Sequence, residues 1–161
     1  MTGMAGRAGN SAPLGAARPM TVRLGVLTRG VPANWSMPAR AATVVAIGLG
    51  AAMVAASAVI HLHLWLAGYR HIHLIGPLFV AQAIAGLVLA VVLAGYRRVL
   101  VIAAGVLYLG GSIVALLISA TVGFLGLHDG LGVPWAGASL ATEVIGLLAL
   151  ACAGVALLRA R

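Results

Sequence analysis

Residues 43–64 read TVVAIGLGAAMVAASAVIHLHL, a continuous stretch without aspartate, glutamate, lysine or arginine. A helix rises about 1.5 Å per residue, so about 20 apolar residues cross the hydrocarbon core of a bilayer, which is about 30 Å thick. This stretch therefore predicts a helix that spans a membrane. Three similar stretches follow, and the predicted spans are about residues 43–64, 75–95, 99–122 and 135–158.

The composition excludes a soluble globular protein. Of the 161 residues, 63% are hydrophobic and 7% are charged, whereas soluble domains carry roughly 25% charged residues. The formal charge of +8 indicates nucleic-acid binding only when the basic residues share one folded face. Here they lie between and outside the apolar stretches, so we expect the lipid bilayer as a partner and no nucleic acid.

The arginines indicate how the chain crosses the membrane. All ten basic residues are arginines, and basic residues collect on the cytoplasmic side of membrane proteins. A cytoplasmic N-terminus leaves Arg70 alone on the outer side and places Arg97 and Arg98 in a cytoplasmic turn. Because short connections join the spans, neighbouring helices are expected to be antiparallel. The predicted fold is an all-α integral membrane four-helix bundle, up-down-up-down, with the N-terminus and C-terminus cytoplasmic.

Residues 1–40 differ from the rest of the chain. They are rich in glycine, alanine, proline and arginine without apolar periodicity, so we expect a disordered cytoplasmic tail ahead of a transmembrane domain at residues 41–161. Translation from Met20 or Met37 instead of Met1 would shorten this tail and keep every span. Alternatively, residues 44–58 are a cleaved signal sequence, which would leave three spans. The apolar stretch continues to Leu66 and favours an uncut helix.

Four of the five histidines surround the first outer turn, where residues 61–73 read HLHLWLAGYRHIH. Imidazole is a common ligand of zinc, copper and iron, so the pattern predicts a candidate metal site formed by His61, His63, His71 and His73. Residues two apart on a helix point about 200° apart, so only one histidine of each pair readily faces a common centre. The alternative is that all four are polar side chains at the level of the lipid headgroups.

A layer of polar residues is predicted inside the membrane. Glu143 is the only acid within a span, and an intramembrane acid is a functional candidate that should face the bundle interior. Counting along each helix places Ser57, Gln82 and Ser112 at a similar depth, with Tyr108 one turn from Ser112. The layer is either an outward-facing pocket in which Glu143 accepts a proton or a cation, or a hydrogen-bond network that fixes helix register.

A resemblance rests on one part of this sequence. The residues that carry it are His61, His63, Leu64, Trp65, Tyr69, Arg70, Ile72, Ile75, Gly76, Pro77, Leu78 and Phe79. Here, and over the spans at about residues 43–158, the chain resembles small four-span membrane proteins of GC-rich bacteria to which no function is assigned. The resemblance implies the architecture and transfers no catalytic motif. We expect a multi-pass protein of the bacterial plasma membrane.

Three hypotheses of function follow. The first is a structural or accessory membrane subunit that contacts other membrane proteins, or further copies of itself, through its helix faces. The alternative is a protein that binds or transports a small molecule, a proton or a metal through Glu143 and the outer histidines, with copper, zinc or haem as candidate cofactors. A membrane enzyme comes third, because the chain has no phosphate-binding loop, nucleophile elbow, paired cysteines or paired intramembrane carboxylates. We therefore name no catalytic residue. We expect no cofactor, and a metal or haem is the alternative.

Overall fold

The computed structural model describes residues 25–159 except 126, 129 and 131. Its elements include α2 (Met37–Leu66), the short 3₁₀ helix η1 (Tyr69–His71), α3 (Ile75–Gly95), α4 (Val99–Thr121) and α5 (Ala136–Arg159). No strand occurs in this part of the chain beyond an isolated bridge between Phe124 and Leu127. The four long helices are each long and apolar enough to cross a membrane. The all-α class and the four apolar helices are thereby confirmed.

Local sequence explains where the helices begin and end. Pro38 lies in the first turn of α2, where its missing N–H costs nothing, and the helix begins at Met37 rather than at the predicted residue 43. Gly68, after α2, has φ 140° and Gly123, after α4, has φ 86°. Residues with a side chain rarely adopt these conformations, so both glycines allow the chain to leave a helix. The other boundaries agree with the predicted spans to within two residues.

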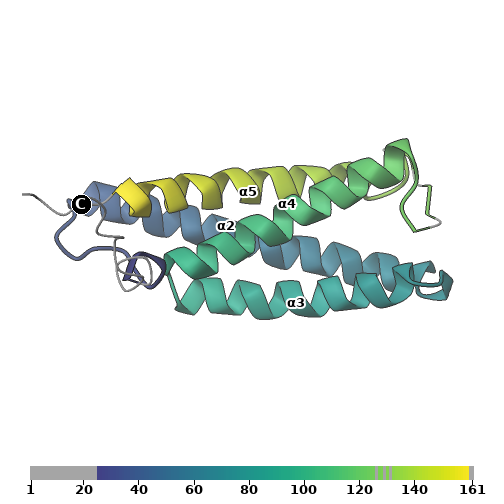
Figure 1. Cartoon of the computed structure of the whole chain (residues 1–161), viewed down its shortest axis with the longest axis horizontal. Coiled ribbons are helices and arrows are strands. Elements are labelled where there is room, and N and C mark those ends of the chain that lie inside the picture. Colours follow the sequence, from purple (N-terminus) through teal and green to yellow (C-terminus); the bar gives the residue numbers. More distant parts are fainter. Residues whose placement is uncertain (1–24, 126, 129, 131, 160–161) are drawn as a thin grey trace, which may run out of the picture.

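Figure 1 shows the four helices lying along one long axis. The turn at residues 96–98 lies at the same end as the start of α2 and the end of α5, and we call this the 96–98 end (Figure 1). The opposite end holds the connection with η1 and is called the η1 end. α2 packs closely on α3 and α5, and α4 packs on α5. By contrast, α3 and α4 meet at the 96–98 end and diverge toward the η1 end (Figure 1).

The apolar core occupies the half of the bundle nearest the 96–98 end. Small residues bring the backbones together there: a Cβ atom added at Gly146 of α5 would lie 2.6 Å from the Cβ of Met53 in α2. Such close approach favours helix association in lipid, where van der Waals packing replaces the hydrophobic effect as the driving force. The most deeply buried aliphatic side chains of this core are Ile47, Val54, Leu93, Leu109, Leu150 and Leu157.

The outward faces of the helices are apolar as well. Large exposed side chains occur along all four long helices, among them Val45, Val91, Leu107 and Leu148. Soluble monomers rarely expose continuous apolar surface of this extent. Lipid tails, in contrast, are as apolar as these side chains, so the exposed faces support a bilayer as the solvent of this bundle.

Residues 25–36 belong to the stretch that the sequence predicts as a cytoplasmic tail, residues 1–40. They lie at the 96–98 end (Figure 1), where Val31 and Trp35 pack against the apolar core. The main-chain N–H of Val99 donates to the carbonyl oxygen of Arg29 at 3.1 Å, which satisfies a donor that the start of α4 leaves unpaired. The side chains of Val31 and Trp35 and this hydrogen bond dock the segment on the bundle. The sequence of the segment has no apolar periodicity that would predict such docking. The remainder of the predicted tail, residues 1–24, lies outside the described residues.

Candidate functional site

Glu143 of α5 lies inside the bundle with its side chain fully buried. Its Oε1 atom accepts hydrogen bonds from the hydroxyl groups of Ser57 in α2 (3.0 Å), Ser112 in α4 (2.6 Å) and Ser139 in α5 (3.0 Å). All three serines are themselves buried. The second carboxyl oxygen, Oε2, is buried and has no hydrogen-bond partner within the described residues. We call these four residues the Glu143 cluster.

The cluster joins three helices at one level. Ser139 reaches Oε1 because it lies four residues before Glu143 on the same helix face, whereas Ser57 and Ser112 reach it because α2 and α4 both pack on α5. Buried polar groups need partners, and hydrogen bonds between helices in a membrane are worth about 0.6 kcal/mol each on average. The two bonds from Ser57 and Ser112 therefore tie α2 and α4 to α5.

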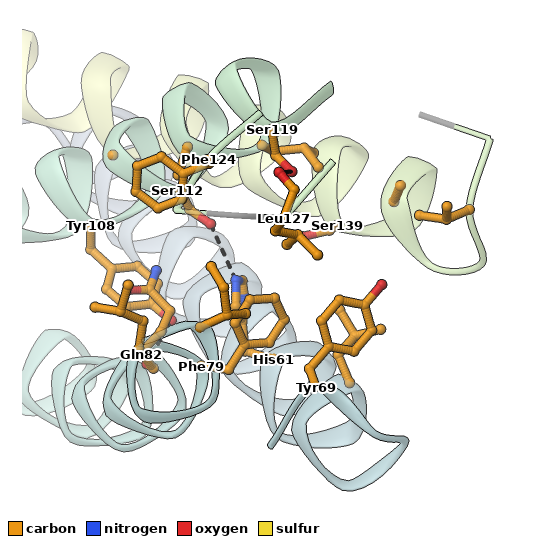
Figure 2. A pocket seen from close by; sticks show the side chains of 18 of the residues that line it. His61, Tyr69, Phe79, Gln82, Tyr108, Ser112, Ser119, Phe124, Leu127 and Ser139 are labelled. Carbon is orange, nitrogen blue, oxygen red and sulfur yellow. Dashed lines mark hydrogen bonds between the residues drawn. The ribbon is translucent and has the colours of Figure 1, made fainter. Parts of the chain in front are cut away.

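His61 extends the cluster toward the η1 end. It lies one turn after Ser57 on α2, and its Nδ1 atom is 2.8 Å from the main-chain oxygen of Ser57. A carbonyl oxygen only accepts, so Nδ1 carries a hydrogen and donates it. The other ring nitrogen, Nε2, lies 3.4 Å from the hydroxyl oxygen of Ser112, and Figure 2 shows these two side chains pointing toward each other.

A cavity of about 340 Å³ lies beside the Glu143 cluster, where α3 and α4 diverge. We call it the α3–α4 pocket. His61, Ser112 and Ser139 line it, so it borders the cluster directly. Its remaining wall is mostly aliphatic and aromatic. The aromatic side chains of the wall are Tyr69, Phe79, Tyr108 and Phe124 (Figure 2).

Tyr108 closes the α3–α4 pocket on the side of the 96–98 end. Its hydroxyl group donates to the main-chain oxygen of Gln82 at 3.0 Å, which ties α4 to α3. The ring lies against Gly86 of α3, where an added Cβ atom would be 2.7 Å from Tyr108 Cζ and 2.8 Å from the Cβ of Ala58. Gly86 therefore makes room both for Tyr108 and for the contact of α3 with α2.

The four outer histidines do not gather around a common centre. The His63 ring lies 5.0 Å from the Trp135 ring, centroid to centroid, and His71 Nε2 lies 3.1 Å from Nε of Arg70. His61 instead faces Ser112 and lies 5.3 Å from the Phe79 ring. Within the described residues, no group of three or more histidine, cysteine, aspartate or glutamate side chains is placed to hold a metal ion. We therefore assign no metal ligand among them.

The predicted polar layer divides into two parts. Glu143, Ser57 and Ser112 form direct hydrogen bonds, while Tyr108 and Gln82 contact each other on the pocket wall. Ser139 belongs to the Glu143 cluster although depth counting did not select it for the layer. Its position one turn before Glu143 was the available signal.

An outward-facing pocket at the polar layer was one of the two alternatives from the sequence, but a cavity between α3 and α4 with an aromatic wall was not predicted. Its formation depends on the divergence of α3 from α4, which is a property of helix packing. The aromatic wall brings Phe124 beside Tyr69 and Phe79, which come from a different part of the chain.

Comparisons with known proteins give no family for this chain. No protein-family model matches it, and no curated protein or solved structure is significantly similar to it. The site is therefore interpreted from its own geometry and chemistry.

Proposed function

We propose that this is a multi-pass protein of the bacterial plasma membrane that binds a small, mostly apolar molecule in the α3–α4 pocket. In this proposal the helices cross up-down-up-down and both termini are cytoplasmic. The observation that carries the proposal is the pocket beside the Glu143 cluster: an apolar cavity with a few convergent polar groups. Concave sites of roughly 300–1,000 Å³ with this composition are typical of small-molecule binding.

The arginines support the orientation. Arg29, Arg40, Arg97, Arg98 and Arg159 belong to segments at the 96–98 end, whereas Arg70 of η1 lies at the opposite end (Figure 1). Because basic residues collect on the cytoplasmic side, the 96–98 end is assigned to the cytoplasm. The α3–α4 pocket then lies in the outer half of the bilayer.

The exposure of the pocket wall supports entry from the lipid. Leu78 of α3 is 46% exposed and Leu107 of α4 is 75% exposed, and both line the pocket. Each side chain therefore borders the cavity and the lipid-facing surface at once. A molecule dissolved in the bilayer reaches the cavity between these two helices.

The wall also favours a ligand with one polar group. The rings of Phe79 and Tyr69 stack at 5.1 Å and offer flat apolar surface, while His61, Gln82 and Ser112 place polar atoms on the inner side. Buried polar groups of a ligand must be hydrogen-bonded, so the polar end is expected to face His61. The apolar body would then lie between α3 and α4.

A binding function takes precedence here over the accessory subunit that the sequence favoured. That hypothesis rested on the lack of a catalytic motif. The pocket, in contrast, is a positive feature with a defined place, lining and route of access.

Two neighbouring glycines provide a matched test. Gly111 lines the α3–α4 pocket, Gly110 does not, and an added Cβ atom meets nothing within 4 Å at either position. Protein in lipid nanodiscs would be titrated with an uncharged, environment-sensitive naphthalene dye, with empty nanodiscs as the blank. Gly111→Phe is expected to weaken saturable binding by about tenfold, equivalent to about 1.4 kcal/mol, whereas Gly110→Phe should bind as the original protein does. Equal binding by the two variants would contradict the proposal.

The orientation has its own test. A fluorescent protein that matures only in the cytoplasm, fused after Arg161, is expected to be fluorescent in cells. A periplasmic reporter at the same position that is active instead would reverse the assignment of the two ends and place the pocket in the inner leaflet.

A further inference from the structure

The Ser112 hydroxyl group lies between two groups that compete for its single hydrogen. Its oxygen is 2.6 Å from Glu143 Oε1 and 3.4 Å from His61 Nε2. A hydroxyl has one hydrogen to donate and lone pairs to accept. Ser112 can therefore donate to Glu143 or to His61, and not to both at once.

Each choice fixes the hydrogens on both neighbours. If Ser112 donates to Glu143, its lone pair faces Nε2, and the contact is favourable only when Nε2 also carries a hydrogen, as in an imidazolium ring. If Ser112 donates to His61, its lone pair faces Oε1 at 2.6 Å, and that contact is favourable only when the carboxyl group is protonated. Nδ1 keeps its hydrogen in both cases because it faces a carbonyl oxygen.

We infer that His61 and Glu143 share one proton through the Ser112 hydroxyl, so that the α3–α4 pocket has a proton-binding site in its wall. The two arrangements contain the same number of hydrogens. Going from the first to the second, the Nε2–H bond of His61 breaks and its proton passes to the Ser112 oxygen. The Ser112 hydroxyl proton passes to Glu143 Oε1, and the imidazole becomes neutral as the carboxylate becomes an acid.

The surroundings make this site accessible from one side. His61 lines the pocket, so a proton can reach its ring from the cavity. On the other side of Glu143, toward the 96–98 end, the next turn of α5 holds Gly146, which packs against Met53 and Leu109. On α2, the fully buried side chain of Val54 lies one turn from Ser57 in the same direction, and on α5 the fully buried Leu150 lies one turn beyond Gly146. The proton of Glu143 is thus exchanged with the pocket and not with the cytoplasmic end.

The groups facing the site from each packed helix are few. α2 contributes His61 and the hydroxyl of Ser57, and α5 contributes the hydroxyl of Ser139. Tyr108 of α4 is a further titratable group within electrostatic reach of Glu143, with its hydroxyl hydrogen bonded to the oxygen of Gln82 in α3. The shared proton therefore belongs to the pair of His61 and Glu143.

The chain is well suited to a direct spectroscopic test. Asp129 and Glu143 are its two acidic side chains, so the infrared band of a protonated carboxyl group can be assigned by its loss in Glu143→Gln. The charge and tautomer of His61 are read from nitrogen-15 shifts of histidine-labelled protein, with His61→Gln for assignment. Both signals are followed against pH in nanodiscs without added ligand.

Two serine variants separate the relay from general packing. Ser112→Ala and Ser139→Ala each remove one hydroxyl donor to Glu143 Oε1, but of these two serines only Ser112 contacts His61. In the original protein and in Ser139→Ala, the carboxyl and imidazole signals are expected to change over the same pH interval. In Ser112→Ala the carboxyl and imidazole signals should change independently of each other, because the hydroxyl group that joins the two side chains is gone.

Two outcomes would overturn the inference. One is that Ser112→Ala and Ser139→Ala give the same curves, and the other is that Nδ1 of His61 carries no hydrogen in the neutral ring. Neither outcome depends on the binding of a molecule in the pocket. Failure of the dye titration with Gly111→Phe would instead remove the proposed function and leave the shared proton intact.

Discussion

Replacing Gly86 by alanine should destabilise the bundle, although alanine is the better helix former. The added Cβ atom would lie 2.7 Å from Tyr108 Cζ and 2.8 Å from the Cβ of Ala58. Carbon atoms pack at about 3.5 Å or more, so α2 and the Tyr108 ring must each withdraw by roughly 0.7 to 0.8 Å. Overpacking of this kind costs about 1–3 kcal/mol. The hydrogen bond from Tyr108 to the oxygen of Gln82, worth about 0.6 kcal/mol, would be lost as well.

The gain in helix propensity offsets about 1 kcal/mol of this cost, so the free energy of unfolding should fall by about 2 kcal/mol. It would be measured by reversible unfolding in mixed micelles with increasing sodium dodecyl sulfate, followed by circular dichroism. Gly48→Ala is the control, because a Cβ atom there meets nothing within 4 Å, and it should raise the free energy of unfolding by up to about 1 kcal/mol through the same gain in helix propensity. Equal stability of the two variants would refute the packing of α3 on α2 and Tyr108 described above.

Two further predictions concern single contacts. Tyr108→Phe keeps the ring against Gly86 and removes only its hydrogen bond, so the free energy of unfolding should fall by about 0.6 kcal/mol in the same assay. A loss above about 2 kcal/mol would show that the hydroxyl does more than bond to Gln82. Trp35→Ala should release residues 25–36 from the core and speed deuterium exchange at the Val99 N–H, which is hydrogen-bonded to the main-chain oxygen of Arg29. Exchange in the middle of α3 serves as the internal control. An unchanged exchange rate at Val99 would mean that Trp35 does not hold this segment.

Much of the fold follows from the sequence because lipid imposes a simple rule. Every main-chain polar group within the hydrocarbon must be satisfied internally, so a long apolar stretch has few alternatives to a helix. Glycines and prolines then set the ends, as Pro38 and Gly68 do for α2. The docking of residues 25–36 does not follow from this rule, because they lie outside the spans and are held by individual contacts such as that of Trp35.

The candidate site was predictable only in part. The cost of an acid in lipid points Glu143 inward, and helix geometry brings His61 and Ser139 to the level of the Glu143 cluster. The sequence does not give the rotation of each helix about its own axis, which decides where each side chain points. The sequence therefore assigned Gln82 to the polar layer by depth alone, but could not tell that its side chain would line the pocket and its main chain would bind Tyr108.

Small-residue spacing shows the same limit. Gly48 and Gly86 both begin four-residue pairs of small residues with Ala52 and Ala90, a pattern that favours helix contacts in membranes. Only Gly86 lies where an added Cβ atom would clash, whereas Gly48 is open. In an alanine-rich chain the pattern is too frequent to select the contact that matters.

The separation of the apolar core from the α3–α4 pocket has a consequence for how such a protein can diversify. The half near the 96–98 end supplies the close packing, so exchanges there cost stability. Around the pocket, a side chain that changes size mainly fills or empties space that the fold does not need. Ligand preference can therefore drift through residues such as Leu107 and Gly111 while the scaffold is preserved by a different set of positions.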